Sequence, residues 1–214
     1  SIVSSTGDRL RLVTTRDGST FADGPLVLHE RAAGRDWQVT GSGFWQVHPG
    51  ATAALVDAVL AGLDPQPGEE ALDLYAGVGL FSAALAQAVG PSGRVLAVES
   101  DEQAVEDARV NLADLPQVAV TRGRVDRALA GPGRSDVVVL DPPRTGARRE
   151  VVAAVAARSP RAVAYVACDP AALARDVSYF AEHGYRLVSL RAFDLFPMTH
   201  HVECVAILAR RRVS

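Results

Sequence analysis

Cys168 is the side chain with the clearest chemical potential. It follows the apolar run Tyr165–Ala167 and precedes Asp169, a good helix N-cap, and Pro170, which suits the first position of a helix. Because the positive end of a helix stabilises a thiolate, we expect the pKa of Cys168 to lie below its ordinary value of about 8.5 and the residue to act as a nucleophile. The alternative is a small buried cysteine that only packs, which is our interpretation of Cys204 within an apolar strand.

Glu203 stands at the start of a strand that is otherwise apolar. A carboxylate there is either a solvated edge residue or a base held near the carboxyl end of a sheet. The neighbouring His200 and His201 are adjacent, which suits no common metal pair. Because the chain has only two cysteines, we expect neither a disulfide framework nor a metal site.

A glycine-rich turn, Asp73–Gly79, follows a short apolar run and precedes a helical pattern. Gly77 and Gly79 let the backbone approach a ligand, and the next helix presents its N-terminus to that ligand. Glu99 ends the next strand, where a carboxylate can accept hydrogen bonds from both ribose hydroxyls. This pattern predicts a nucleotide-like cofactor, although some turns of this kind bind nothing.

The same pattern serves NAD, flavin and S-adenosyl-L-methionine folds. Ser82 stands where the dinucleotide fingerprint has its third glycine or alanine, and Asp73 before the glycines suits a site for S-adenosyl-L-methionine. The turn therefore favours the methyl donor without excluding the other cofactors.

A second loop, Asp141-Pro142-Pro143-Arg144, directly follows the apolar run 137–140. The two prolines fix the backbone and remove two amide donors, so the loop has a defined shape. It is expected at the carboxyl end of a strand, beside the point where open α/β sheets bind their ligands. Amino-group methyltransferases have a similar loop followed by an aromatic residue, and Arg144 in that place argues against nitrogen methylation.

The elements that position these residues alternate regularly between strand and helix from about residue 48. Short strands buried on both faces indicate a parallel sheet covered by helices. Two last strands, at 186–194 and 202–209, are joined by a loop too short for a crossover helix, which predicts an antiparallel hairpin at the sheet edge. The pattern resembles the Rossmann-like class I methyltransferase architecture with a mostly parallel seven-stranded sheet. The remaining strands are expected at 70–74, 94–98, 117–121, 136–140 and 162–167.

The first 45 residues have a different character, with short β-like pieces between Gly and Asp turns. We expect 1–45 to be the remnant of a β-rich appended region and 46–214 to form the methyltransferase domain. The 214 residues, 48% of them hydrophobic, suffice for one full core, and no apolar run is long enough for a membrane span. A monomer in the reducing cytoplasm is the natural interpretation.

The net charge of −3 argues against a protein that binds nucleic acid by electrostatics alone. The charge is uneven, however, because 141–161 contains five arginines and two acids. Both a solvated helix face and a patch that contacts phosphates remain open for this segment.

Taken together, these motifs resemble the RNA (uracil-5-)-methyltransferase family, in order and spacing, from about Gly43 to Leu208. The matching segments are Asp141–Gly146, Cys168–Pro170 with Leu173 and Arg175-Asp176, Asp194–Glu203, and Phe44–Val47. The chain differs from the usual family pattern at Ala76, Leu80 and Asp169.

The resemblance implies methyl transfer to a uridine of tRNA or rRNA, with Cys168 as the nucleophile and Glu203 as the proton acceptor. It also implies that S-adenosyl-L-methionine is contacted by Gln46, Tyr75, Glu99 and Asp141. We expect Pro142, Pro143 and Arg144 to contact the substrate.

The chemistry fits these two residues independently of the resemblance. The C5 carbon of uracil is a poor nucleophile, and addition of a thiolate at C6 makes it reactive toward a methyl donor. A base must then remove the C5 proton. Three alternatives stay open: a methyltransferase for a small molecule or protein, a non-catalytic cofactor- or RNA-binding module, and an NAD-dependent enzyme, which would give no role to Cys168 or the Pro-Pro-Arg loop.

Overall fold

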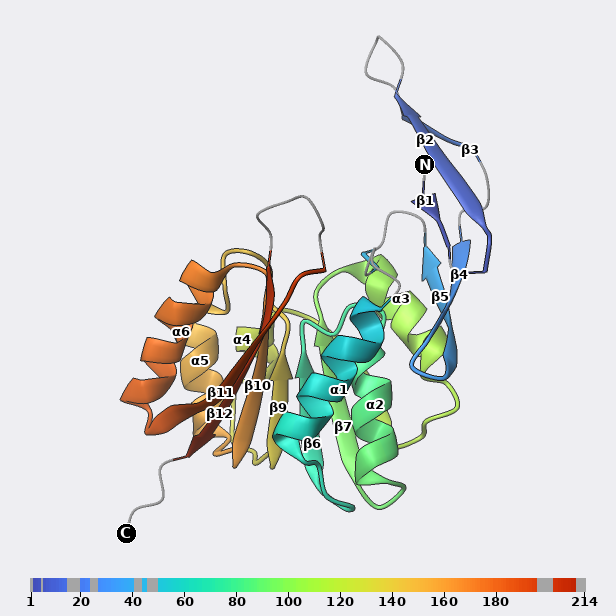
Figure 1. Cartoon of the computed structure of the whole chain (residues 1–214). Helices are drawn as coiled ribbons and strands as arrows, with labels where there is room; N and C mark the ends of the chain where they lie inside the picture. The colour runs from blue at the N-terminus through green and yellow to red at the C-terminus, as the bar shows by residue number, and fades with distance from the viewer. Residues whose placement is uncertain are drawn as a thin grey trace.

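The computed structural model describes residues 2–4, 6–14, 20–23, 27–40, 44–45, 50–195 and 202–210. Its centre is a seven-stranded sheet in the order β11-β12-β10-β9-β6-β7-β8 (Figure 1). Strands β6 to β10 are parallel, and β12 is antiparallel to both of its neighbours. The strands are β6 (Glu70–Leu74), β7 (Arg94–Glu99), β8 (Val118–Arg122), β9 (Val137–Leu140), β10 (Ala162–Ala167), β11 (Tyr185–Phe193) and β12 (Glu203–Arg210).

This architecture confirms the predicted α/β fold with its mostly parallel seven-stranded sheet and antiparallel C-terminal pair. Each of the seven strands predicted for this sheet is present, with bounds that differ by at most one residue. One detail goes beyond the prediction, because the second strand of the pair, β12, lies between β10 and the edge strand β11.

Six helices of the described chain cover the sheet; the five longer ones each bury several apolar residues, and the one-turn α4 buries Val125. Helices α1 and α2 pack on one face and α4, α5 and α6 on the other, because successive strand residues point to opposite faces. The third helix packs beside α2. The helices are α1 (Ala51–Leu63), α2 (Leu80–Val89), α3 (Glu102–Asn111), α4 (Val125–Ala128), α5 (Arg148–Ala157) and α6 (Pro170–Glu182).

The N-terminal region forms two small antiparallel sheets. One contains β1 (Ile2–Val3), β2 (Arg9–Thr14) and β3 (Thr20–Asp23), and the other contains β4 (Val27–Ala32) and β5 (Arg35–Thr40). The first of these sheets projects away from the large one (Figure 1).

The β4–β5 hairpin is packed firmly onto α3. Trp37 is buried against Ala108 and Leu112. The guanidinium of Arg35 donates to both carboxylate oxygens of Asp114, at 2.9 and 2.6 Å. The hairpin thus shares a core with the helical layer, and the boundary at residue 45 remains a prediction.

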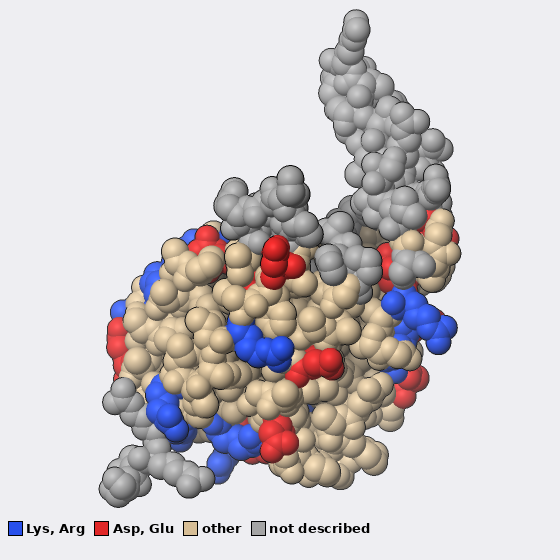
Figure 2. Space-filling model, in the orientation of Figure 1, with Lys and Arg blue, Asp and Glu red and all other residues tan. Residues whose placement is uncertain are grey.

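Acidic and basic side chains are interspersed on the face shown in Figure 2. Within the arginine-rich segment, Arg149 pairs with Glu182 and Arg161 with Glu69. The Arg149–Glu182 pair is solvated, and such pairs contribute weakly to stability, whereas Arg161 also donates to the carbonyls of Leu63 and Asp64. Among the described residues, no helix has the length and apolar character needed to cross a bilayer.

Candidate active site at the carboxyl end of the sheet

The glycine turn after β6 has an unusual backbone. Tyr75 adopts a positive φ of 65°, which is strained for a bulky residue, and Gly77 and Gly79 have φ of 54° and 97°. The amides of Tyr75 and Ala76 donate to the carbonyl of Val98, at 2.9 and 3.1 Å, and so hold this shape. A Cβ added at Gly77 would meet nothing within 4 Å, so this part of the turn faces open space.

Glu99 is bonded directly to the turn. One carboxylate oxygen accepts from the amide of Gly77 at 2.9 Å, and the other accepts from the amides of Ser100 and Asp101 at 2.6 and 2.8 Å. The carboxylate at the end of β7 therefore lies against the glycine loop, where the sequence predicted it.

Asp73 lies beneath the same turn and is fully buried. Its Oδ2 accepts from the hydroxyl of Ser82 at 2.6 Å, whereas its buried Oδ1 has no hydrogen-bond partner among the described residues. Burial raises the pKa of Asp73 to about 6. A buried carboxylate oxygen of this kind is costly unless a donor reaches it. Ser82, noted in the sequence only as a departure from the dinucleotide fingerprint, anchors this carboxylate.

A cavity of about 510 Å³ lies beside the turn. Tyr75, Ser100 and Val125 contribute to its walls, together with Pro143 and the segment 145–148. Ser100 and the segment Arg124–Asp126 were not predicted from the sequence, although both follow the carboxyl ends of strands, where α/β folds bind ligands. A hollow of about 640 Å³ at the opposite edge of the sheet is lined by residues at the starts of strands, such as Glu70 and Arg94, and by none of the predicted contact residues.

The Asp141-Pro-Pro-Arg144 loop adjoins both the turn and the sheet edge. The amide of Asp141 donates to the carbonyl of Leu74 at 3.1 Å, and the amide of Gly146 donates to the carbonyl of Pro143 at 2.8 Å. This second bond closes a turn that carries the exposed Arg144. Burial and the charge of Glu203, with smaller effects of Asp73 and Glu99, raise the pKa of Asp141 to about 8.

Strand pairing brings Cys168 and Glu203 together. The last residue of β10, Ala167, pairs with Cys204 of β12 in an antiparallel register. Continuing this register by one residue sets Cys168 opposite Glu203 on one face, while Cys204 points into the core on the other face. Cys168 is half-buried and Glu203 is buried. The packing interpretation of Cys204 is confirmed.

The helix after Cys168 begins as predicted, with Asp169 as N-cap and Pro170 in the first turn. The prediction of a lowered pKa for Cys168 is wrong. Burial raises the pKa, the charges of Glu203 and Asp141 raise it further, and Arg144 lowers it. The carboxylate of Asp169 also accepts from the amide of Ala172 at 2.7 Å, so the helix end is already capped by an anion.

The structure thus gathers Cys168, Glu203, Asp141 and Arg144 at one edge of the sheet, next to the glycine turn. Pro142, Pro143 and Arg144 line the same narrow crevice as Cys168. Gln46, His200 and His201 lie outside the described residues. Trp45, just before Gln46, packs its ring 5.8 Å from that of Trp37. The described residues contain no group of three side chains suited to hold a metal ion.

Two protein-family models match the chain. Residues 50–170 match the methyltransferase small domain, and residues 133–211, which include Cys168 and Glu203, match tRNA (Uracil-5-)-methyltransferase. A Streptomyces avermitilis protein named as an uncharacterized RNA methyltransferase is 53% identical over 199 residues, which are 92% of this chain and 46% of the relative. A similarly named Streptomyces coelicolor protein is 53% identical over 92% of this chain and 43% of its own length. The chain therefore spans about half the length of these curated relatives.

Among solved structures, the tRNA (uracil-54, C5)-methyltransferase of Pyrococcus abyssi, in complex with S-adenosyl-L-homocysteine, is similar with a TM-score of 0.74 and 30% identity. The match covers 88% of this chain and 46% of that one. A Precorrin-6y C5,15-methyltransferase from Geobacter metallireducens, at 19% identity and a TM-score of 0.60 over 72% of this chain and 87% of that one, shares the fold alone. The resemblance predicted from the motifs is confirmed by the match of residues 133–211 and by these relatives, and the chain belongs to the methyltransferase small-domain family with a class I methyltransferase fold.

Proposed function

We propose that this domain transfers a methyl group from S-adenosyl-L-methionine to C5 of a uridine in tRNA or rRNA, through a covalent bond between Cys168 and C6. One observation carries the proposal: the register of β10 and β12 sets a thiol opposite a carboxylate, beside a rigid loop and a nucleotide-sized cavity. The names of the relatives and of the Pyrococcus abyssi structure support the same chemistry.

The glycine turn and its surroundings fit the cofactor. Gly77 offers open space beside a backbone that a ligand can approach, and the buried Oδ1 of Asp73 can accept a hydrogen bond. Glu99 is the acceptor for ribose hydroxyls, Tyr75 lines the adjoining cavity, and Gly79 and Asp141 are further contacts that we propose. Val125 and Pro143 offer apolar walls for a flat base in the adjoining cavity. Gln46 remains a contact implied by the family resemblance.

When bound, S-adenosyl-L-methionine supplies an electrophilic methyl group. The Sγ of Cys168 adds to C6 of the uracil, and the electron pair of the C5–C6 double bond moves toward C5 and the O4 carbonyl. C5 then forms a bond to the methyl group as the bond from that methyl to the donor sulfur breaks. Glu203 takes the C5 proton, the C5–C6 double bond reforms, and the sulfur of Cys168 leaves with its electron pair.

The charged groups around Cys168 have opposite effects on its thiolate. Arg144 favours the thiolate, and Glu203 and Asp141 disfavour it. Burial raises the pKa of Glu203, so its carboxylate is a stronger base than an exposed one. The uridine must leave its stack to reach both groups, and Pro142, Pro143 and Arg144 border the path that it would take.

The test uses RNA in which the uridines carry tritium at C5, with unlabelled cofactor. Methylation at C5 releases one tritium for each methyl group transferred, and omission of the cofactor is the control. Methyl transfer to RNA without tritium release would exclude C5 as the target. Cofactor binding in calorimetry with no transfer to any RNA would favour a non-catalytic module, and transfer only to a protein or small molecule would favour the other enzyme class.

A further inference from the structure

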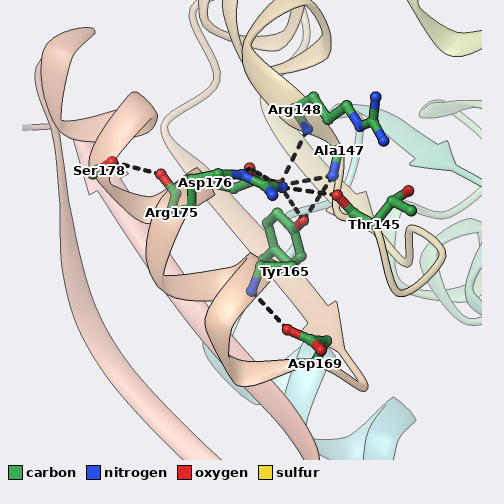
Figure 3. Close-up of polar contacts among 9 residues, drawn as sticks. Thr145, Ala147, Arg148, Tyr165, Asp169, Arg175, Asp176 and Ser178 are labelled. Carbon is green, nitrogen blue, oxygen red and sulfur yellow. Dashed lines mark hydrogen bonds and ion pairs between the residues drawn. The ribbon is translucent and has the colours of Figure 1, made fainter.

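A buried carboxylate, Asp176, lies two turns into the helix that follows Cys168, and it is fully enclosed. Its Oδ2 accepts from the hydroxyl of Tyr165 at 2.6 Å and from the amides of Ala147 and Arg148 at 2.7 and 3.2 Å (Figure 3). Its Oδ1 accepts from Nε and Nη2 of Arg175 at 3.0 and 2.9 Å. One side chain of α6 thus binds β10 and the start of α5 together.

Asp176 serves as the N-terminal cap of a helix to which it does not belong. Ala147 is the N-cap residue of α5 and makes no side-chain cap bond, because it has no acceptor. Arg148, the first residue of α5, has a positive φ of 69°, which is strained for a side chain of its size. The amides of both residues point to Asp176, and the amide of Ala147 also donates to the hydroxyl of Tyr165 at 3.0 Å. The strained entry into α5 is therefore held from α6.

The contacts extend back to the tip of the Pro-Pro-Arg loop. Nη2 of Arg175 donates to the carbonyl of Thr145 at 2.8 Å. A Cβ added at Gly146 would lie 2.4 Å from Nη2 of Arg175 and 2.5 Å from Oδ2 of Asp176, so only glycine fits. Of the four residues after Arg144, three are thus hydrogen-bonded to the Arg175–Asp176 pair, and Gly146 lies close against it.

Arg144 in turn belongs to the surroundings of Cys168. It lines the same crevice as Cys168, and among the charged groups that act on the thiol, Glu203, Asp141 and Arg144, it is the cation. In the chain, Asp176 follows Cys168 after the first two turns of α6. In space, Asp176 is bonded to the turn that directly follows Arg144. We propose that Asp176, with Tyr165 and Arg175, is a positioning residue that holds Arg144 beside Cys168 and thereby sets the reactivity of the thiol.

This inference rests on the proposed function only in giving Cys168 the role of nucleophile. A purely structural role for Asp176 would stabilise the packing of α5 on α6 and leave the thiol unaffected. The distinguishing measurement is the pH dependence of Cys168 alkylation by iodoacetamide, followed by peptide mass spectrometry without RNA or cofactor.

The first variant is Asp176→Asn. An amide group in place of one carboxylate oxygen cannot accept from both the Arg175 guanidinium and the amides of Ala147 and Arg148, so the turn relaxes. Loss of the cation beside Cys168 lowers the thiolate fraction, and we expect alkylation about threefold slower at pH values below the thiol pKa.

The matched control is Asp107→Asn. Asp107, on α3, is a similarly buried carboxylate that accepts from the amide and hydroxyl of Thr40 at 2.7 and 2.9 Å. The Asp107→Asn substitution should leave the alkylation profile of Cys168 unchanged at temperatures where circular dichroism shows both variants folded. Equal slowing in the two variants would overturn the proposal, because it would reflect loss of stability alone.

Arg144→Gln should slow alkylation as much as Asp176→Asn, and the double variant should be no slower than either single one. Additive slowing, or a folded Asp176→Asn variant with the wild-type profile, would contradict the inference. If Asp176→Asn does not fold, Arg175→Gln decides, because Arg175 is partly exposed and its loss frees the carbonyl of Thr145. An unchanged profile in that variant overturns the proposal. Failure of methyl transfer in the wild type would instead reject the proposed function, which the alkylation assay does not use.

Discussion

Replacing Glu203 with Gln should make Cys168 more reactive and the protein less active, two effects of opposite sign from one change. The carboxylate raises the pKa of the Cys168 thiol, and we propose it as the base that removes the C5 proton. Glutamine has nearly the same shape but carries neither charge nor basicity. The two consequences can be measured separately.

The size of the first effect follows from the strand register. Residues directly opposed in an antiparallel pair have Cβ atoms about 5 Å apart, and two unit charges at about 5 Å repel by roughly 0.8 kcal/mol in water and roughly 3 kcal/mol at an effective dielectric constant of about 20. Because Cys168 is half-buried rather than enclosed, we apply the lower value, which gives about a fourfold larger thiolate fraction below the thiol pKa.

The assays are alkylation of Cys168 by iodoacetamide and methyl incorporation into RNA. Glu203→Gln should speed alkylation about fourfold and slow methyl transfer about 100-fold or more, the usual contribution of a general base. With unmodified uridine RNA and cofactor, the adduct should accumulate, since its last step needs the base. Cys204→Ala is the control that assigns alkylation to Cys168. Unchanged or slower alkylation would refute the geometry, and full methylation activity would refute the role of Glu203.

Three further predictions concern stability, each measured by urea unfolding. Gly79→Ala should destabilise the fold by about 2 kcal/mol, because its φ is 97° and the new Cβ would lie 2.7 Å from Cδ1 of Leu112; a change under half that size would contradict the packing. Gly77→Ala, with open space around the new Cβ, should cost only about 1 kcal/mol for its positive φ, and a larger loss than at Gly79 would be inconsistent with that difference. Burial raises the pKa of Asp73 to about 6 in the folded state, so the stability that protonated Asp73 contributes is fully present below the unfolded pKa near 4 and is lost as pH rises through 6. The stability of Asp73→Asn relative to wild type should therefore increase by about 2–3 kcal/mol from pH 4 to pH 7. A difference in stability that does not vary with pH would exclude this titration.

Local patterns sufficed to predict much of the fold and part of the site. The strands and the N-cap at Asp169 follow from short-range periodicity and capping chemistry, which one segment contains by itself. The arrangement of Glu99 against Gly77 also followed, because parallel strands end at the same sheet edge.

Features that depend on pairing between distant segments could not be predicted. The register that sets Cys168 opposite Glu203 requires β12 to lie beside β10. The predicted direction of the Cys168 pKa shift was wrong because only the helix end is local in sequence. The pKa is raised by burial and by two carboxylates, Glu203 and Asp141, which come from two distant segments. The buried bonds of Asp176 likewise join α6 to a loop about 30 residues earlier in the chain.

The proposed bond between Cys168 and C6 of the uracil is tested most directly by trapping the covalent intermediate. The protein is incubated with cofactor and RNA in which 5-fluorouracil replaces uracil, since Glu203 cannot remove fluorine from C5 and the adduct cannot resolve. We expect an RNA–protein species that is stable to denaturation and whose nucleotide maps to the peptide containing Cys168. It should be absent in Cys168→Ala and present in Cys204→Ala. Methyl transfer to uridine that persists in Cys168→Ala, or an adduct that maps to another residue, would contradict the proposed bond.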